Sequence, residues 1–179
     1  VARRSLGAAG TNTAALAFGG FPTSGVGNKT ELWNGTNWTA VNDLNNKNEG
    51  VVGAGTQTAA LAMGGSETPT ATESWNGTNW TAITAMNIGT TRSGSAGTQT
   101  AALIFAGAPG TQTQTQSWNG SSWTTVNSLT TARSSLAGCG TNTAALGFGG
   151  YLNPGITAAT EEFNTGVPIA NVWVTSGSM

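Results

Sequence analysis

The sequence contains no histidine, and only one cysteine and one tyrosine among its 179 residues. Without histidine, these residues supply no Ser-His-Asp triad, no histidine-ligated zinc site and no copper site. The lone Cys139 excludes an intramolecular disulfide and any metal site made of cysteines alone. We therefore expect neither a metal nor another cofactor.

Charge is also scarce, because 6 Lys+Arg and 7 Asp+Glu make up 7% of the chain, against about 25% in average proteins. The net charge of -1 and the lack of a basic run argue against nucleic-acid binding. No apolar run approaches the ~20 residues that span a bilayer, so we expect no membrane insertion. Solubility must come from Thr, Asn, Gln and Ser, which favours an extracellular or virion-surface location.

Glycine and tryptophan are plentiful, with 27 and 7 residues. Low charge with abundant Gly, Thr and Asn is compatible with disorder. The 37% hydrophobic content and the regular tryptophan spacing favour a folded repeat protein instead.

The repeat is visible in one motif. "GTNTAAL" at 10–16 returns at 55–61, 97–103 and 140–146 as "GTQTAAL" or "GTNTAAL", at intervals of 45, 42 and 43 residues. Such a period indicates one supersecondary unit copied along the chain. Gly, Thr and Asn are poor helix formers and no unit has a 3.6-residue apolar stripe, so helical arrays are excluded.

Each unit offers four short apolar runs separated by turn signals, in the third unit "RSGSAG", "TAALIFAG", "TQSWN" and "WTTV". Four short strands with short connections make an antiparallel meander, which is one blade of a β-propeller.

In the first three units, an Asn-Gly hairpin signal joins the third and fourth runs; the fourth unit reads "FNTGVPIANVWV" and lacks it. A two-residue loop would place Trp75 and Trp80 diagonally on one face, and a four-residue loop would place them opposite each other; a three-residue loop would break this parity. On a shared face they would pack against the next blade. We therefore predict a structural framework made of the following tryptophans: Trp33, Trp38, Trp75, Trp80, Trp118, Trp123 and Trp173.

Each unit has a glycine doublet after an apolar strand, an aromatic residue ten to thirteen positions later and, in most units, a Trp five positions after that. A basic residue then opens the next unit. This pattern resembles the Kelch repeat. The doublets are Gly19-Gly20, Gly64-Gly65 and Gly149-Gly150, with a degenerate Ala106-Gly107. The aromatics are Trp33, Trp75, Trp118 and Phe163. The basic openings are Arg3 or Arg4, Arg92 and Arg133, with Lys47 or Asn48 in the second unit.

The Thr/Asn/Gly-rich variant with "WNGTNW" is similar to Kelch-like repeats of bacteriophage tail fibres and virion proteins, which implies an adhesive or structural surface module. The expected fold is an all-β, Kelch-like propeller of four blades with four antiparallel strands each. We expect one domain, 1–179, with blades near 1–43, 44–86, 87–129 and 130–179. A longer parent chain or a ring shared between chains, and hence a homo-oligomer, stays open.

Acids recur just before the aromatic, at Glu31, Glu73 and either Glu161 or Glu162. Two carboxylates on facing strands could serve a glycosidase. The pattern favours a structural reading, in which each acid faces a repeated Arg or a backbone amide. We likewise expect Cys139 to fill a small apolar slot, as Ala9 and Ala54 would. No enzyme is predicted.

In a meander, the first-to-second and third-to-fourth turns share one end of the blade, and these turns are near-copies. The second-to-third and blade-to-blade loops share the other end and vary, and variable loops on a constant scaffold are where recognition usually lies. There we predict the ligand-binding residues Phe21, Lys29, Lys47, Tyr151 and Asn153. The aromatics could instead tuck over their own blade edges.

The sequence thus favours a non-catalytic binding module that recognises host-surface carbohydrate. The alternative is a structural virion or filament subunit whose loops contact neighbouring proteins.

Overall fold

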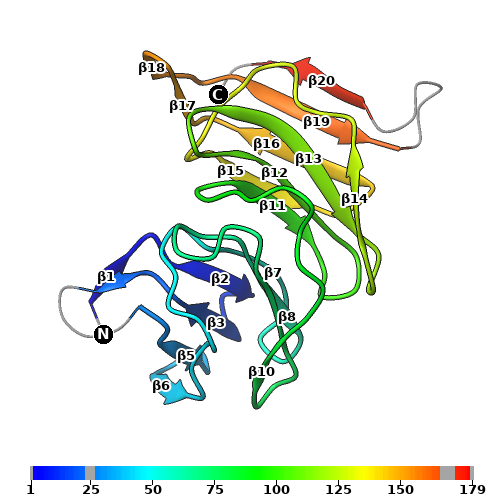
Figure 1. Ribbon diagram of the computed structural model, residues 1–179. Helices are drawn as coiled ribbons and strands as arrows, with labels where there is room; N and C mark the ends of the chain where they lie inside the picture. The colour runs from blue at the N-terminus through cyan, green and yellow to red at the C-terminus, as the bar shows by residue number, and fades with distance from the viewer. Residues whose placement is uncertain (1, 23–26, 166–171, 178–179) are drawn as a thin grey trace. The chain divides into compact units, whose positions relative to one another are not determined.

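The computed structural model describes residues 2–22, 27–165 and 172–177. No helix occurs among them. The predicted fold class is confirmed: the chain is all-β and forms the four blades of a β-propeller, each a four-stranded antiparallel meander with strands in chain order (Figure 1).

The chain divides into two compact units, Val1–Thr91 and Arg92–Met179, with two blades each. In unit 1, blade 1 consists of β2 (Gly7–Gly10), β3 (Ala15–Phe18), β5 (Thr30–Trp33) and β6 (Trp38–Val41). Blade 2 consists of β7 (Val52–Gly55), β8 (Ala60–Met63), β9 (Thr72–Trp75) and β10 (Trp80–Ala82).

In unit 2, blade 3 consists of β11 (Gly94–Gly97), β12 (Ala102–Gly107), β13 (Gln112–Trp118) and β14 (Trp123–Val126). Blade 4 consists of β15 (Ala137–Gly140), β16 (Ala144–Phe148), β19 (Thr160–Asn164) and β20 (Val172–Ser176).

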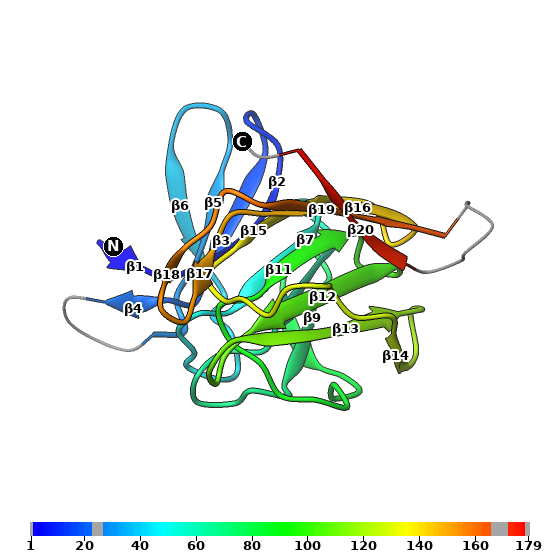
Figure 2. The same ribbon diagram turned by 90° about the horizontal axis from the view of Figure 1, so that it is seen from above.

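Two small ribbons extend the variable ends of the blades. In unit 1, β1 (Arg3–Arg4) pairs with β4 (Phe21–Pro22), and in unit 2, β17 (Tyr151–Leu152) pairs with β18 (Gly155–Ile156) (Figure 2). One strand of each ribbon, β4 or β17, begins directly after a glycine doublet, where both glycines have positive φ, from 65° at Gly19 to 111° at Gly150. The left-handed backbone that glycine tolerates turns the chain out of the blade here.

The hairpin between the third and fourth strands has a four-residue loop. Trp75 is therefore directly opposite Trp80, and the same register joins Trp33 to Trp38 and Trp118 to Trp123. The Asn76 side-chain Oδ1 accepts bonds from the Thr78 and Asn79 amides at 3.0 and 2.8 Å. An Asn side chain that mimics backbone in this way explains why Asn begins each of these turns.

Blade 4 reaches the same arrangement with different residues. Trp173 lies opposite Phe163, with ring centroids 5.4 Å apart. Residues 166–171 of the connecting loop, and with them part of the run "FNTGVPIANVWV", lie outside the described residues, as do residues 23–26 of the loop in blade 1.

In each unit, a phenylalanine of the first blade packs under a tryptophan of the second. Phe18 at the end of β3 lies 4.9 Å from Trp80, and Phe105 of β12 lies 4.7 Å from Trp173. A Cβ placed on Gly138 of the next blade's first strand would lie 2.5 Å from the Phe105 ring. Glycine at this position therefore lets the two blades close over the ring.

One expected loop is much shorter than predicted. The runs "TAALIFAG" and "TQSWN" of the third unit leave "APGTQTQ", residues 108–114, as the connection between the second and third strands, yet β13 already begins at Gln112. Gly107 pairs with Gln112 beyond a β-bulge after Phe105, so alternating Gln and Thr residues continue the ladder. Only residues 108–111 remain as the loop.

Candidate functional site

A pocket of about 190 Å³ opens at the variable end of unit 1, and we call it the unit 1 pocket. It lies where the second-to-third-strand loops of blades 1 and 2 approach the segment that enters blade 2. Its lining includes Phe21, Pro22, Lys47, Asn48, Glu49 and Glu67. Two of the predicted ligand-binding residues, Phe21 and Lys47, therefore line one pocket.

Phe21 is held by the β1–β4 ribbon, in which Arg4 pairs with it. The Arg4 guanidinium carbon stands 4.5 Å from the centre of the Phe21 ring, which is the distance of a cation–π contact. The ring is still 48% exposed. Phe21 is thus supported by its own blade and open to solvent at the same time.

The polar wall of the unit 1 pocket is built around Asn48, which is buried. Its Nδ2 donates to the Gly64 carbonyl at 2.6 Å and to Thr68 Oγ1 at 2.8 Å, and its Oδ1 accepts from the Glu67 amide at 3.1 Å. The Glu67 carboxylate accepts from Ser66 Oγ at 2.8 Å. This wall is rigid and carries negative charge.

A second pocket, of about 500 Å³, opens at the variable end of unit 2, and we call it the unit 2 pocket. Its lining includes Arg92, Thr111, Ser134, Ser135, Tyr151 and Asn153. The Tyr151 side chain is 44% exposed. Here two of the three remaining predicted residues, Tyr151 and Asn153, line one pocket.

Backbone hydrogen bonds join the walls of the unit 2 pocket. Ser134 and Tyr151 exchange two of them, at 3.0 and 2.7 Å, and the Ser135 amide donates to the Arg92 carbonyl at 2.7 Å. Arg92 and Ser135 both have φ near 55°, in the left-handed region. The three segments that carry the polar and aromatic side chains are therefore fixed relative to one another within unit 2.

The two pockets occupy equivalent positions in the repeat. The Tyr151 amide donates to Ser134 at 2.7 Å, and in unit 1 the Ser66 amide donates to Glu49 at 2.9 Å in the same relation to the glycine doublet. The scaffold is shared, but the side chains differ. The unit 1 pocket has Glu49, Glu67 and Lys47, whereas Arg92 is the charged residue among those that line the unit 2 pocket.

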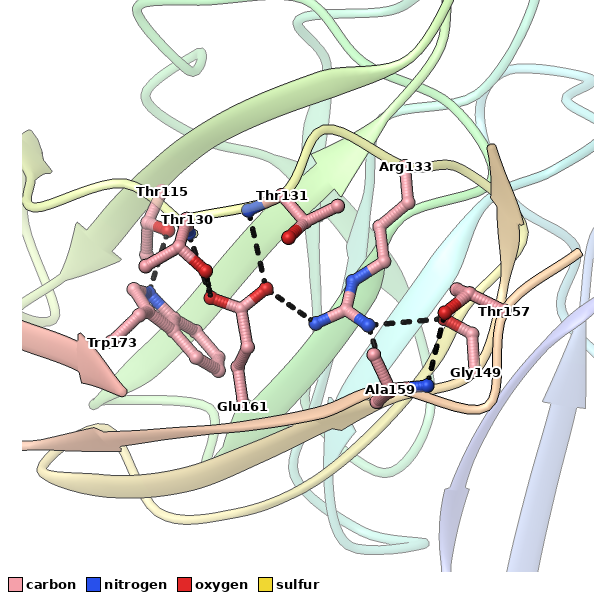
Figure 3. A network of polar contacts seen from close by, with 9 residues as sticks. All are labelled: Thr115, Thr130, Thr131, Arg133, Gly149, Thr157, Ala159, Glu161 and Trp173. Carbon is pink, nitrogen blue, oxygen red and sulfur yellow. Dashed lines mark hydrogen bonds and ion pairs between the residues drawn. The ribbon is translucent and has the colours of Figure 1, made fainter. Parts of the chain in front are cut away.

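A buried polar network surrounds Arg133, the residue before Ser134 of the unit 2 pocket (Figure 3). The Arg133 guanidinium contacts Glu161 Oε1 at 2.7 Å and donates to the Ala159 carbonyl at 2.8 Å. Glu161 Oε2 also accepts from the Thr130 amide and hydroxyl, both at 2.7 Å. Burial lowers the pKa of Arg133, and the negative charge of Glu161 opposes that shift. The network anchors the residue that precedes Ser134.

The recurrent acids at Glu31, Glu73 and Glu161 are engaged in structural bonds. Glu31 pairs with Arg3 at 2.9 Å. Glu73 has no arginine partner in the contacts described, and its carboxylate instead accepts from the amides of Asn45 and Asn46 at 2.9 and 3.1 Å. Glu161, and not Glu162, occupies the equivalent position, with its backbone opposite Gly147.

The arginine pattern was partly wrong. Register places Arg3, Asn48, Thr90 and Arg133 at equivalent positions, four residues before the first strand of each blade. Arg92 lies two residues later, at the left-handed position shared with Ser5, Gly50 and Ser135. It was expected to open a blade as Arg133 does, and it instead lines the unit 2 pocket. Its spacing to Arg133, 41 residues against 43 for the repeated Gly-Thr motif, indicates the offset.

Two other expectations differ from the structure. Lys29 lines neither of the two pockets; its ammonium lies 2.7 Å from Asp43 Oδ2, at the open end of the β5–β6 hairpin. Cys139 is exposed and does not fill an apolar slot. It lies on β15 opposite Leu146, and that side chain is exposed as well.

The predicted framework tryptophans differ in burial. Trp75, Trp80, Trp118, Trp123 and Trp173 are buried, Trp33 is half-buried, and Trp38 is 50% exposed. The indole N–H of Trp75 donates to the Gln57 carbonyl at 3.0 Å, and that of Trp118 to Gln99 at the same distance. These bonds tie the third strand to the repeated Gly-Thr turn within blades 2 and 3.

Comparison with known proteins leaves the site to be judged on its geometry. No family model matches this chain, and no curated protein matches it either. Among the described residues, no three His, Cys, Asp or Glu side chains gather where they could hold a metal ion. The described part of the chain also has no helix of the length and apolarity needed to cross a bilayer.

Proposed function

We propose that this chain is a Kelch-like propeller module of a phage particle or another extracellular assembly, and that it binds host-surface carbohydrate without catalysing a reaction. The observation that carries the proposal is the pairing of an exposed aromatic ring with polar side chains in both pockets: Phe21 with Lys47, and Tyr151 with Asn153. Exposed aromatic rings stack on the apolar faces of sugars, while amides, hydroxyls and cations bond the sugar hydroxyls.

The contrast between the two ends of each blade supports the proposal. The constant end consists of tight turns whose Asn and Thr side chains bond their own backbone, as Asn34 does with Thr36 and Asn37. The variable end carries both pockets and side chains that differ from blade to blade. Loops that change on a constant scaffold are suited to recognition.

The test is a glycan-array screen of three proteins: the intact chain, Phe21→Ala/Tyr151→Ala, and Trp38→Ala. Trp38 is a matched control because its exposure is similar and it lines neither pocket. We expect the intact chain and Trp38→Ala to bind the same glycans and the double variant to lose them. Failure of the folded intact chain to bind any glycan would reject this function and favour the alternative, a structural subunit whose loops contact neighbouring proteins.

A further inference from the structure

The two pockets differ most in charge. In the unit 1 pocket, the carboxylates of Glu49 and Glu67 outnumber the ammonium of Lys47. The equivalent of Glu49 in unit 2 is Ser134, and the equivalent of Glu67, two residues after the glycine doublet, is Leu152. Both acids of the first pocket are thus replaced by uncharged residues, and Arg92 adds a positive charge to the second.

We propose that the unit 2 pocket selects a sugar that carries a carboxylate, such as a uronic acid; this inference rests on the proposed carbohydrate-binding function. A guanidinium presents five N–H donors in a planar fork, and this fork matches the two oxygens of a carboxylate. Charge-assisted bonds of this kind are about twice as strong as neutral ones. The Arg92 backbone is fixed by the bond from Ser135, so its side chain starts from a defined position.

The other residues of the pocket complete a sugar site. The Tyr151 ring is half-exposed, and its backbone is fixed by the two hydrogen bonds that it exchanges with the Ser134 backbone. Tyr151 stacks on the pyranose ring, and the hydroxyls of Thr111, Ser134 and Ser135 with the Asn153 amide bond its hydroxyl groups. The side chains come from both blades of unit 2, so the pocket contacts the sugar from two sides.

The single tyrosine gives this inference a direct probe. Protein labelled with 3-fluorotyrosine has one ¹⁹F resonance, at Tyr151. It is titrated with matched pairs of sugars that differ only at C6: methyl glucuronide against methyl glucoside, and methyl galacturonide against methyl galactoside.

We expect at least one acidic sugar to shift the Tyr151 resonance with a Kd roughly tenfold or more below that of its neutral partner. A difference of this size is what one additional charge-assisted hydrogen bond provides. Arg92→Gln is expected to reduce its affinity to that of the neutral sugar. Lys47→Gln, in the other pocket, is the control and is expected to change nothing.

Equal affinity for acidic and neutral sugars, or an unchanged Kd in Arg92→Gln, would overturn the selection for acid and leave the carbohydrate-binding function standing. A Tyr151 resonance that no sugar moves would also overturn it. The glycan array then separates the two failures, since an array with bound glycans retains the proposed function and a blank array removes both.

Discussion

The rings of Phe18 and Trp80 meet edge to face, with centroids 4.9 Å apart and planes at 64°. Phe18 ends the second strand of blade 1, and Trp80 begins the fourth strand of blade 2. Phe105 and Trp173 repeat the contact in unit 2 at 4.7 Å. Within each unit, this aromatic pair is the centre of the seam between blades.

Replacing the tryptophan of this seam is expected to destabilise unit 1 strongly. Trp80→Ala removes a buried side chain and should cost about 3–5 kcal/mol of unfolding free energy. Trp38→Ala is the matched control, since Trp38 occupies the same position in blade 1 but is half-exposed, and it should cost less than about 1.5 kcal/mol. Chemical denaturation measures both. Equal losses would show that the seam is not what stabilises the unit.

The hydrogen bond of the seam can be tested separately. The Trp80 indole N–H donates to Thr30 Oγ1 at 3.0 Å, and both groups are buried. Thr30→Val keeps the shape but leaves the indole without its acceptor, at an expected cost of about 1–3 kcal/mol. Thr30→Ser keeps the hydroxyl and should lose clearly less stability. A Val variant as stable as the Ser variant would contradict the role of this bond.

Glycine is required where the next blade covers the phenylalanine. A Cβ on Gly138 would lie 2.5 Å from the Phe105 ring and 2.7 Å from the Ser95 carbonyl oxygen. Gly138→Ala is therefore expected to cost about 1–3 kcal/mol through overpacking. Gly177→Ala, with nothing within 4 Å of its Cβ, serves as the control. Thermal melts in which both variants match the parent would refute this packing.

The buried Arg133–Glu161 pair should behave as a coupled unit. Glu161→Gln leaves the guanidinium buried without its counter-charge, at an expected cost of about 3–5 kcal/mol. Arg133→Met leaves the carboxylate in the same condition. The double variant should lose less than the sum of the two single losses, by about 1–3 kcal/mol. Strictly additive losses in denaturation experiments would mean that the two side chains act independently.

The scaffold was predictable from the sequence because the same strand and turn pattern occurs in four copies. Three copies show the same Asn-Gly turn, and in blade 4, which lacks it, Trp173 marks the fourth strand. The contact of Phe18 with Trp80 was not predicted, although a signal existed: an aromatic or methionine precedes the glycine doublet in "LAFGG", "LAMGG" and "LGFGG".

The pockets were only partly predictable. Loop variability placed Phe21, Lys47, Tyr151 and Asn153 at the end of the blades that carries both pockets, but the sequence does not say which of them meet. Lys29 was included because of its charge, and its pairing with Asp43 depends on the register of the β5–β6 hairpin. Arg92 was missed as a pocket residue although the sequence carried a signal: it stands five residues before Gly97, whereas Arg133 stands seven before Gly140.

The most direct test of the account is hydrogen–deuterium exchange with and without the glycan that binds most strongly in the array screen. A glycan bound in the unit 1 pocket is expected to slow exchange in residues 64–68, and one bound in the unit 2 pocket to slow it in residues 107–112, 133–135 and 150–157. Exchange in the Asn-Gly turns at 34–37, 76–79 and 119–122 is expected to stay unchanged. Protection confined to those turns would contradict it, because recognition would then lie on the constant end of the blades.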